Sequence, residues 1–242
     1  MRFSESIFAA RFNITRGDLE GYLADALSRG GDYADLYFEY LLTSSIGLDE
    51  SMVKSATQGV SMGVGVRVIA GGRTGYAYSD DLSPEKIRKA ARVAASIAAG
   101  PSTIEKLGLN DGPTHNLYPV IIAPTETAFL DRVELVKRAD RAARAYDPRI
   151  FQVQAFYADS LRQVMVATSD GVLTIDRQPQ ARLNVAALAR QDGGEPQRGQ
   201  AGGVGASRWT FSSTRKLPSI SPPKPRARPW SCWMRWTRRR AK

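Results

Sequence analysis

The chain has 242 residues, of which 43% are hydrophobic and 24% charged, and this composition excludes a wholly disordered or collagen-like protein. A single Cys and a single His exclude a disulfide framework and a zinc site built by this chain alone. No apolar run approaches the ~20 residues of a membrane-spanning helix, and the N-terminal residues lack the apolar core of a secretory signal. We therefore expect a cytoplasmic protein without membrane contact.

The net charge of +10 comes from the end of the chain. Residues 196–242 contain 12 basic residues and no acidic one, whereas residues 1–195 hold 22 basic and 24 acidic residues. All four Trp and the single Cys also lie after residue 196. We therefore predict three parts: an N-terminal α+β domain over 1–118, the start of a central α+β domain over 119–193, and a disordered basic tail, rich in Pro, Arg and Trp, over 194–242.

Residues 15–29 are predicted to form the first helix. Thr15 and Asp18 have the spacing of a capping box, and Gly30 and Gly31 end the helix. The helical period of its apolar residues predicts one buried stripe: Leu19, Tyr22, Leu23, Ala26 and Leu27.

Strand signals follow this helix. Residues 35–42 are rich in aromatic side chains, and residues 64–70 alternate between apolar and other residues. Gly71 and Gly72 predict a hairpin turn that leads into residues 73–78. We therefore expect β-structure from 53 to 78.

A second helix is predicted to begin at Ser83, which caps it, with Pro84 at the first helical position. Gly100 and Pro101 end this helix. Its apolar stripe is predicted from five residues with helical spacing: Ile87, Ala90, Ala91, Ala94 and Ile97. Residues 101–118 are rich in Pro, Gly, Asn and Asp and indicate a linker.

A third helix is predicted over 127–146, before Pro148. Its apolar positions are Leu130, Val133, Val136, Ala139 and Ala143.

An antiparallel meander should follow the third helix. Residues 151–157 alternate through Phe151, Val153, Ala155 and Tyr157, residues 161–167 and 172–176 flank a Ser-Asp-Gly turn at 169–171, and residues 182–190 alternate again. These signals predict an α+β fold with helices packed on largely antiparallel sheets, in two small subdomains.

The periodicity ends near residue 193. Trp and Met each have a single codon, so the amino-acid sequence of residues 230–236 determines most of the nucleotide sequence that encodes it. Reading from the third base of each codon turns this segment, and also residues 209–213, into apolar core-like sequence. Our hypothesis is a frameshift near codon 193 or soon after. The alternative is a real basic tail that neutralises phosphates and stacks its Trp side chains on bases.

The candidate site residues of the body have simpler structural interpretations. Gly59, Gly63 and Gly65 run into an alternating strand and not into a helix N-terminus, so they are predicted to be strand glycines and not a phosphate loop. Asp35 and Glu39 share one strand face, and a solvated edge explains them better than paired-carboxylate catalysis.

Two further candidates are also interpreted as structural. Tyr76, Tyr78, Asp80 and Asp81 should end a strand and lead into the second helix. His115 has no second ligand at metal-binding spacing and is interpreted as a surface residue. The sequence contains no G-x-S-x-G, H-E-x-x-H or P-loop motif, so we assign no catalytic, cofactor-binding or metal-binding residue.

Three segments resemble the N-terminal half of the TldD/PmbA family: residues 32–40 (DYADLYFEY), 62–83 and 167–193. The run Tyr-x-Tyr-Ser-Asp at 76–80 is more similar to TldD than to its sister subunit TldE/PmbA. The resemblance implies a cytoplasmic zinc metallopeptidase, also described as a modulator of DNA gyrase, that acts on unfolded peptides and pairs with a TldE/PmbA-like subunit as a heterodimer.

The metal motif of that family, H-E-x-x-x-H with a further Cys ligand, has no counterpart in this sequence. His115 and Cys232 match neither position, so we expect no cofactor in this chain and zinc only in a full-length member. The resemblance therefore implies a non-catalytic N-terminal portion. Two alternatives remain open: a nucleic-acid- or gyrase-associated binding protein that uses the basic tail, with nonspecific nucleic-acid binding, and a scaffold that pairs with the TldE-like subunit.

Overall fold

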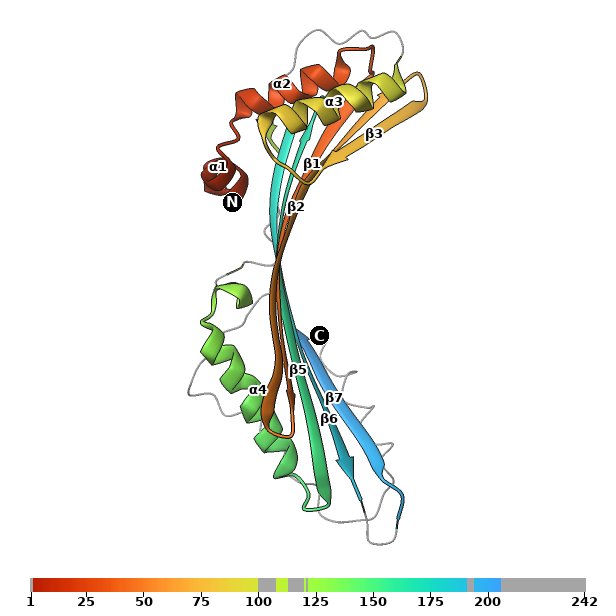
Figure 1. Ribbon diagram of the computed structural model, residues 1–242. Helices are drawn as coiled ribbons and strands as arrows, with labels where there is room; N and C mark the ends of the chain where they lie inside the picture. The colour runs from red at the N-terminus through yellow and green to blue at the C-terminus, as the bar shows by residue number, and fades with distance from the viewer. Residues whose placement is uncertain (1, 100–107, 113–119, 121, 191–193, 206–242) are drawn as a thin grey trace, which may run out of the picture.

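The computed structural model describes residues 2–99, 108–112, 120, 122–190 and 194–205. Within these ranges the fold is α+β, as predicted. One seven-stranded sheet has the strand order β3-β2-β1-β5-β6-β4, and β7 also pairs with β6 (Figure 1). The pairings are antiparallel apart from the parallel contact of β4 with β6.

The helices and strands have the following bounds. The helical segments are η1 (Phe3–Glu5), α1 (Ile7–Phe12), α2 (Arg16–Leu27), α3 (Pro84–Ala98), η2 (Pro124–Glu126) and α4 (Phe129–Arg144). The strands are β1 (Tyr33–Asp49), β2 (Met52–Ala70), β3 (Arg73–Ser79), β4 (Asn110–Asp111), β5 (Ile150–Thr168), β6 (Val172–Ala189) and β7 (Gln197–Gly205).

Four long strands run through both halves of the molecule. Strands β1, β2, β5 and β6 have 17, 19, 19 and 18 residues, which corresponds to about 60 Å at ~3.4 Å per residue. A larger core lies at one end of the sheet under α2 and α3, and a smaller core lies at the other end under α4 (Figure 1). The two halves therefore have separate cores but share one sheet, where the sequence suggested several sheets.

Helix α2 forms as its sequence predicts. Thr15 is the N-cap, and it exchanges hydrogen bonds with Asp18 in a capping box. The five residues of the predicted stripe are all buried. Their side chains form the larger core together with Ala34, Leu36 and Phe38 of β1.

Helix α3 begins where predicted, but its cap differs. The Ser83 side chain makes no capping hydrogen bond; instead Asp81 Oδ1 accepts a hydrogen bond from the Ser83 amide at 2.8 Å. The prediction of a buried Ile97 was also wrong, because Ile97 is 57% exposed and Ala95 and Ala98 are buried instead. The buried face of α3 thus consists of alanines and one larger side chain, Ile87.

The predicted apolar face of α4 is confirmed at Val136, which is buried, and at Val133, which packs against the smaller core. Leu130 is 76% exposed, whereas the buried residues are Arg132, Leu135, Val136 and Asp140. Two charged side chains are buried because each meets an oppositely charged or hydroxyl partner beneath the helix, as described below. On β5, Phe151 is the one residue of the predicted alternating set Phe151, Val153, Ala155 and Tyr157 that is exposed, at 48%.

The predicted turns are present. Gly71 and Gly72 have φ angles of +53° and +80° between β2 and β3, and Gly171 has a φ of +91° between β5 and β6. These left-handed conformations favour Gly, because the Cβ of any other residue would be crowded against the backbone at a positive φ.

Two segments contain strands where the sequence indicated none. Residues 197–205, assigned to the disordered tail, form β7 along β6. Asn110–Asp111, inside the predicted linker, pairs with Val172 and Leu173. Neither segment has strong strand propensity, so pairing with β6 determines its conformation. The remainder of the tail after residue 205, including the four Trp, lies outside the described residues.

Candidate functional site

The strands have one face covered by helices and one uncovered face. On β1 the even-numbered side chains are buried from Ala34 to Tyr40 and from Ser44 to Leu48, and on β5 the odd-numbered side chains are buried from Val153 to Ala167. Since side chains alternate across a strand, the remaining side chains point to the opposite face. The described helices leave this second face open along the sheet.

A buried polar cluster fixes α4 to the covered face. Arg132 Nη1 lies 3.0 Å from Asp159 Oδ2 on β5 and 2.6 Å from Ser44 Oγ on β1. Ser44 Oγ donates to Asp159 Oδ1 at 2.6 Å, and the Tyr157 hydroxyl donates to Asp159 Oδ2 at 2.8 Å. The charged side chains are only 4% and 0% exposed. Burial and the Asp159 carboxylate raise the pKa of Tyr157, so the phenol stays protonated as a donor.

A second polar contact fixes the β1–β2 hairpin to α4. Ser51 Oγ donates to Asp140 Oδ2 at 2.7 Å, and Arg144 Nε lies 3.1 Å from Asp140 Oδ1. These contacts hold the helix across β1, β5 and β6. They join α4 to the strands on the covered face of this end of the sheet.

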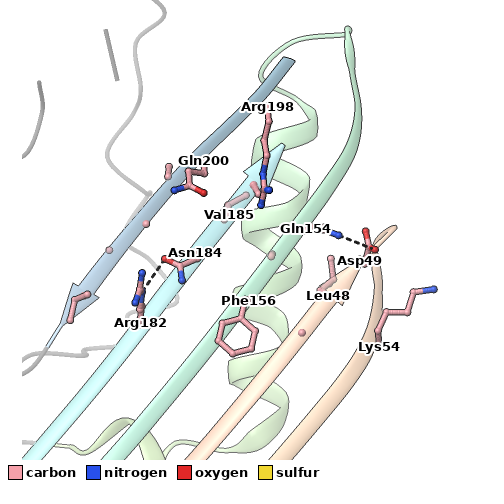
Figure 2. A pocket seen from close by; sticks show the side chains of 17 residues that line it. Leu48, Asp49, Lys54, Gln154, Phe156, Arg182, Asn184, Val185, Arg198 and Gln200 are labelled. Atoms are coloured by element: carbon pink, nitrogen blue, oxygen red, sulfur yellow. Dashed lines mark hydrogen bonds between the residues drawn. The ribbon is translucent and has the colours of Figure 1, made fainter. Parts of the chain in front are cut away.

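The uncovered face has a hollow of about 720 Å³ opposite α4. Figure 2 shows side chains from β1, β2, β5, β6 and β7 around it, with α4 behind the sheet. Small residues form much of its floor, and the polar lining groups are Asp49, Lys54, Gln154, Arg182, Asn184, Arg198 and Gln200.

Hydrogen-bonding side chains line the hollow. Asp49 accepts hydrogen bonds from Gln152 Nε2 at 3.3 Å and Gln154 Nε2 at 3.4 Å, which lower the pKa of its carboxyl group. Arg182 Nε donates to Asn184 Oδ1 at 3.2 Å. Amide, carboxylate and guanidinium groups over a floor of small residues can hydrogen-bond to a polypeptide segment laid across the strands.

Two ion pairs occupy the other end of the uncovered face, and they include the two predicted carboxylates. Asp35 pairs with Arg67 of β2 at 2.5 Å, which raises the pKa of the guanidinium. Glu39 accepts from the Tyr37 hydroxyl at 2.8 Å and lies 3.5 Å from Arg162. Both carboxylates thus lie on an open face, as predicted, but on a central strand and not at an edge.

The glycine and tyrosine predictions agree with the structure. Gly59, Gly63 and Gly65 lie within β2. At Gly65 a Cβ would be only 2.6 Å from the Tyr76 hydroxyl oxygen, so the absence of a side chain makes room for that phenol. Tyr78 is 77% exposed.

Metal ligands are not gathered in the described part of the chain: among these residues, no group of three or more His, Cys, Asp or Glu is placed to hold a metal ion. His115 and Cys232 lie outside the described residues. The donor set present does not fit a zinc site, and we derive no zinc-dependent step from it. No helix among the described residues is long and apolar enough to span a membrane.

Comparison with known proteins identifies the family. A family model described as PmbA/TldA metallopeptidase domain 1 matches residues 34–98, and the model of the central domain of the same family matches residues 122–219. The chain belongs to the TldD/PmbA family. The central-domain match reaches beyond residue 193, which agrees with the pairing of β7 to the sheet.

Relatives of the TldD/PmbA chain are similar over most of its length. The metalloprotease TldD homologue of Buchnera aphidicola from Acyrthosiphon pisum is 30% identical over 189 residues, which are 78% of this chain and 39% of the relative. That of Haemophilus influenzae is 31% identical over 183 residues, 73% of this chain and 37% of the relative. The chain thus spans about two fifths of the length of these curated relatives.

Solved structures of the TldD/PmbA family have the same fold. A candidate modulator of DNA gyrase from Thermotoga maritima superposes with a TM-score of 0.64 at 18% identity, covering 80% of this chain and 44% of that one. TldE from Thermococcus kodakarensis gives a TM-score of 0.62 at 18% identity, covering 78% and 42%. At this identity the similarity establishes the fold.

The residues that fix α4 were missed by sequence reasoning. Arg132 and Asp140 have the spacing of surface residues on an amphipathic helix, and their partners Asp159, Ser44 and Ser51 lie on other elements. One sequence feature could have indicated these polar contacts. The apolar stripe of residues 127–146 is weak, and a helix with few core residues needs other contacts to pack.

Proposed function

We propose that this chain is the non-catalytic N-terminal portion of a TldD-like zinc metallopeptidase that acts on unfolded peptides. The matches to domain 1 and the central domain of the metallopeptidase family carry this proposal. The sequence has a single His, so the two His of the family's metal motif have to come from another part of the protein.

In this proposal the sheet is a framework and its uncovered face is a docking surface. The hollow opposite α4 is lined by amide and charged groups, which can form hydrogen bonds to a neighbouring polypeptide. We propose a TldE/PmbA-like subunit as the heterodimer partner, which the similar fold of TldE supports.

Metal analysis and a peptidase assay test the proposal. The purified chain should contain no stoichiometric zinc by plasma mass spectrometry and should not hydrolyse an unfolded casein substrate after zinc is added. Stoichiometric zinc together with hydrolysis would refute it. Sedimentation of the chain mixed with a TldE-like subunit tests the partner separately, and two independent peaks would argue against that pairing.

The basic tail supports a second candidate function, a nucleic-acid- or gyrase-associated binding protein. Residues 196–242 carry 12 basic and no acidic residues. Weak phosphate contacts should be lost by about 200 mM salt, because bound cations compete with the protein. Sequence-selective DNA binding that survives this salt concentration would favour the second function over the first.

A further inference from the structure

Two arginines at the hollow carry charges that no carboxylate of the described residues neutralises. Arg182 of β6 donates to Asn184 Oδ1 at 3.2 Å, and Arg198 of β7 is exposed; neither forms an ion pair within the described ranges. By contrast, Arg162 of β5 and Arg177 of β6 each pair with a glutamate. Because a guanidinium group stays protonated in proteins, the charges of Arg182 and Arg198 are available to an external anion.

The two arginines lie at opposite ends of a line of amide side chains. Arg198 is opposite Leu188 of β6, and Leu188 is six residues from Arg182, which corresponds to about 20 Å at ~3.4 Å per residue. Asn184 and Gln200 lie between the two arginines (Figure 2). An extended polypeptide advances by a similar distance per residue, so carboxylates about six residues apart match the two guanidinium groups.

The amides between the arginines suit the main chain of an extended segment. A carboxamide side chain offers both a donor and an acceptor, as a peptide group does. In a folded protein nearly all main-chain groups are already paired, whereas an unfolded segment has free N–H and C=O groups. Phe156, which lines the hollow and is 44% exposed, provides an apolar contact for a side chain of the segment. These groups favour an unfolded segment over the surface of a folded protein.

The size and the charge of the hollow restrict the ligand further. Its volume of about 720 Å³ lies within the ~300–1,000 Å³ of typical ligand sites, whereas a subunit interface buries ~800 Å² on each partner. The hollow therefore fits a short segment. Lys54 already pairs with Glu50 at 3.4 Å, and Asp49 is the one carboxylate among the described lining residues. The two unpaired arginines outweigh it, so an acidic segment is preferred to a basic one.

We propose that the hollow binds a short acidic segment of an unfolded polypeptide substrate, with two of its carboxylates paired to Arg182 and Arg198. The side chains of Asn184 and Gln200 hydrogen-bond to the main chain between these carboxylates. That the polypeptide is a substrate rests on the proposed peptidase function, whereas the binding chemistry rests on the hollow alone. The hollow occupies only part of the uncovered face, so the rest of this face stays available to a partner subunit.

Fluorescence anisotropy with matched peptides tests the proposal in the full chain without added metal. The acidic probe is a fluorescein-labelled Gly/Ser peptide with two Glu about six residues apart, and the control peptide has Gln at both positions. The acidic peptide should bind about tenfold more tightly, because each of its carboxylates gains a charge-assisted hydrogen bond.

Arginine variants locate the site. Arg182→Gln and Arg198→Gln should each weaken binding of the acidic peptide about threefold and leave the Gln peptide unaffected. The matched control is Arg141→Gln on the exposed side of α4, which lowers the net charge equally and should leave both affinities unchanged. The basic residues after 205 are present in every variant, so their nonspecific attraction cancels. The double variant Arg182→Glu with Arg198→Glu should prefer a peptide with Lys in place of Glu, which a folding defect would not produce.

Competition experiments test the source of the segment. Unfolded casein, which is acidic, should displace the acidic peptide. Equal affinity for the Glu and Gln peptides, or equal effects of Arg182→Gln and Arg141→Gln, would overturn the proposal. So would displacement by a TldE-like subunit and not by casein, or tighter binding of an oligothymidylate that the same variants weaken. The zinc and hydrolysis measurements test the proposed function separately, since peptide binding requires neither a metal nor catalysis.

Discussion

Replacing Arg132 tests whether the buried polar cluster fixes α4 to the sheet. Arg132→Met keeps the length of the side chain but removes the partner of Asp159, whose carboxylate is fully buried. An unpaired buried charge of this kind costs about 3–5 kcal/mol. The hydroxyl groups of Ser44 and Tyr157 still donate to Asp159, so we expect a loss near the lower end of that range.

A matched variant on the same helix provides the control. Arg141 pairs with Glu134 on the exposed side of α4, where both side chains are more than half exposed. Because exposed ion pairs contribute about 0–1 kcal/mol, Arg141→Met should change the free energy of unfolding by less than about 1 kcal/mol.

Urea unfolding followed by far-ultraviolet circular dichroism measures both effects. Circular dichroism is chosen over tryptophan fluorescence because all four Trp lie after residue 206 and none belongs to α4 or to the strands that it contacts. A double-mutant cycle with Asp159→Asn should give a coupling energy of about 2 kcal/mol or more. If Arg132→Met and Arg141→Met destabilise the protein equally, the cluster does not have the role assigned to it.

Three further predictions concern local structure. Gly75→Ala should lower the free energy of unfolding by about 1–3 kcal/mol, since its Cβ would overlap the backbone of α3; a thermal midpoint equal to the wild type would contradict this. Thr15→Ala should cost about 1 kcal/mol of helix-capping energy, whereas Ser83→Ala should cost almost nothing because its hydroxyl makes no capping bond; thermal unfolding of the two variants measures this difference. The Asp147 carboxyl group, hydrogen-bonded to Arg149, should titrate with a pKa of about 2, so the stability it contributes is present above its unfolded pKa of about 3.8 and is lost as the pH falls towards 2. Carbon NMR of the Asp147 carboxyl group measures this titration. Arg149→Ala should raise the pH at the midpoint of the titration.

Local signals in the sequence were sufficient for several elements. The Thr15–Asp18 box and the apolar spacing of residues 19–27 predicted α2, since a capping box and a 3.6-residue period act within a few residues. Gly71, Gly72 and Gly171 likewise marked the hairpin turns. The assignment of Gly63 and Gly65 to a strand was also correct, because alternation continues through them.

The candidate site was less accessible to sequence reasoning. The hollow on the uncovered face combines Asp49 with Arg182 and Arg198 from three separate strands, and no short motif joins them. The positions of Asp35 and Glu39 on one face followed from the two-residue strand period, but their partners Arg67 and Arg162 depend on strand order and register.

The sequence by itself determined the α+β class, the capped helix α2, the glycine turns and the family resemblance, because these depend on residues that are close in the chain. Tertiary structure decided that one sheet joins both halves, that Arg132 and Asp140 are buried, and that residues 197–205 form β7. A buried charge needs a partner, and the pairing of β1 with β5 is what places Ser44 beside Asp159, where both contact Arg132. A weak strand such as β7 similarly depends on hydrogen bonds that β6 supplies.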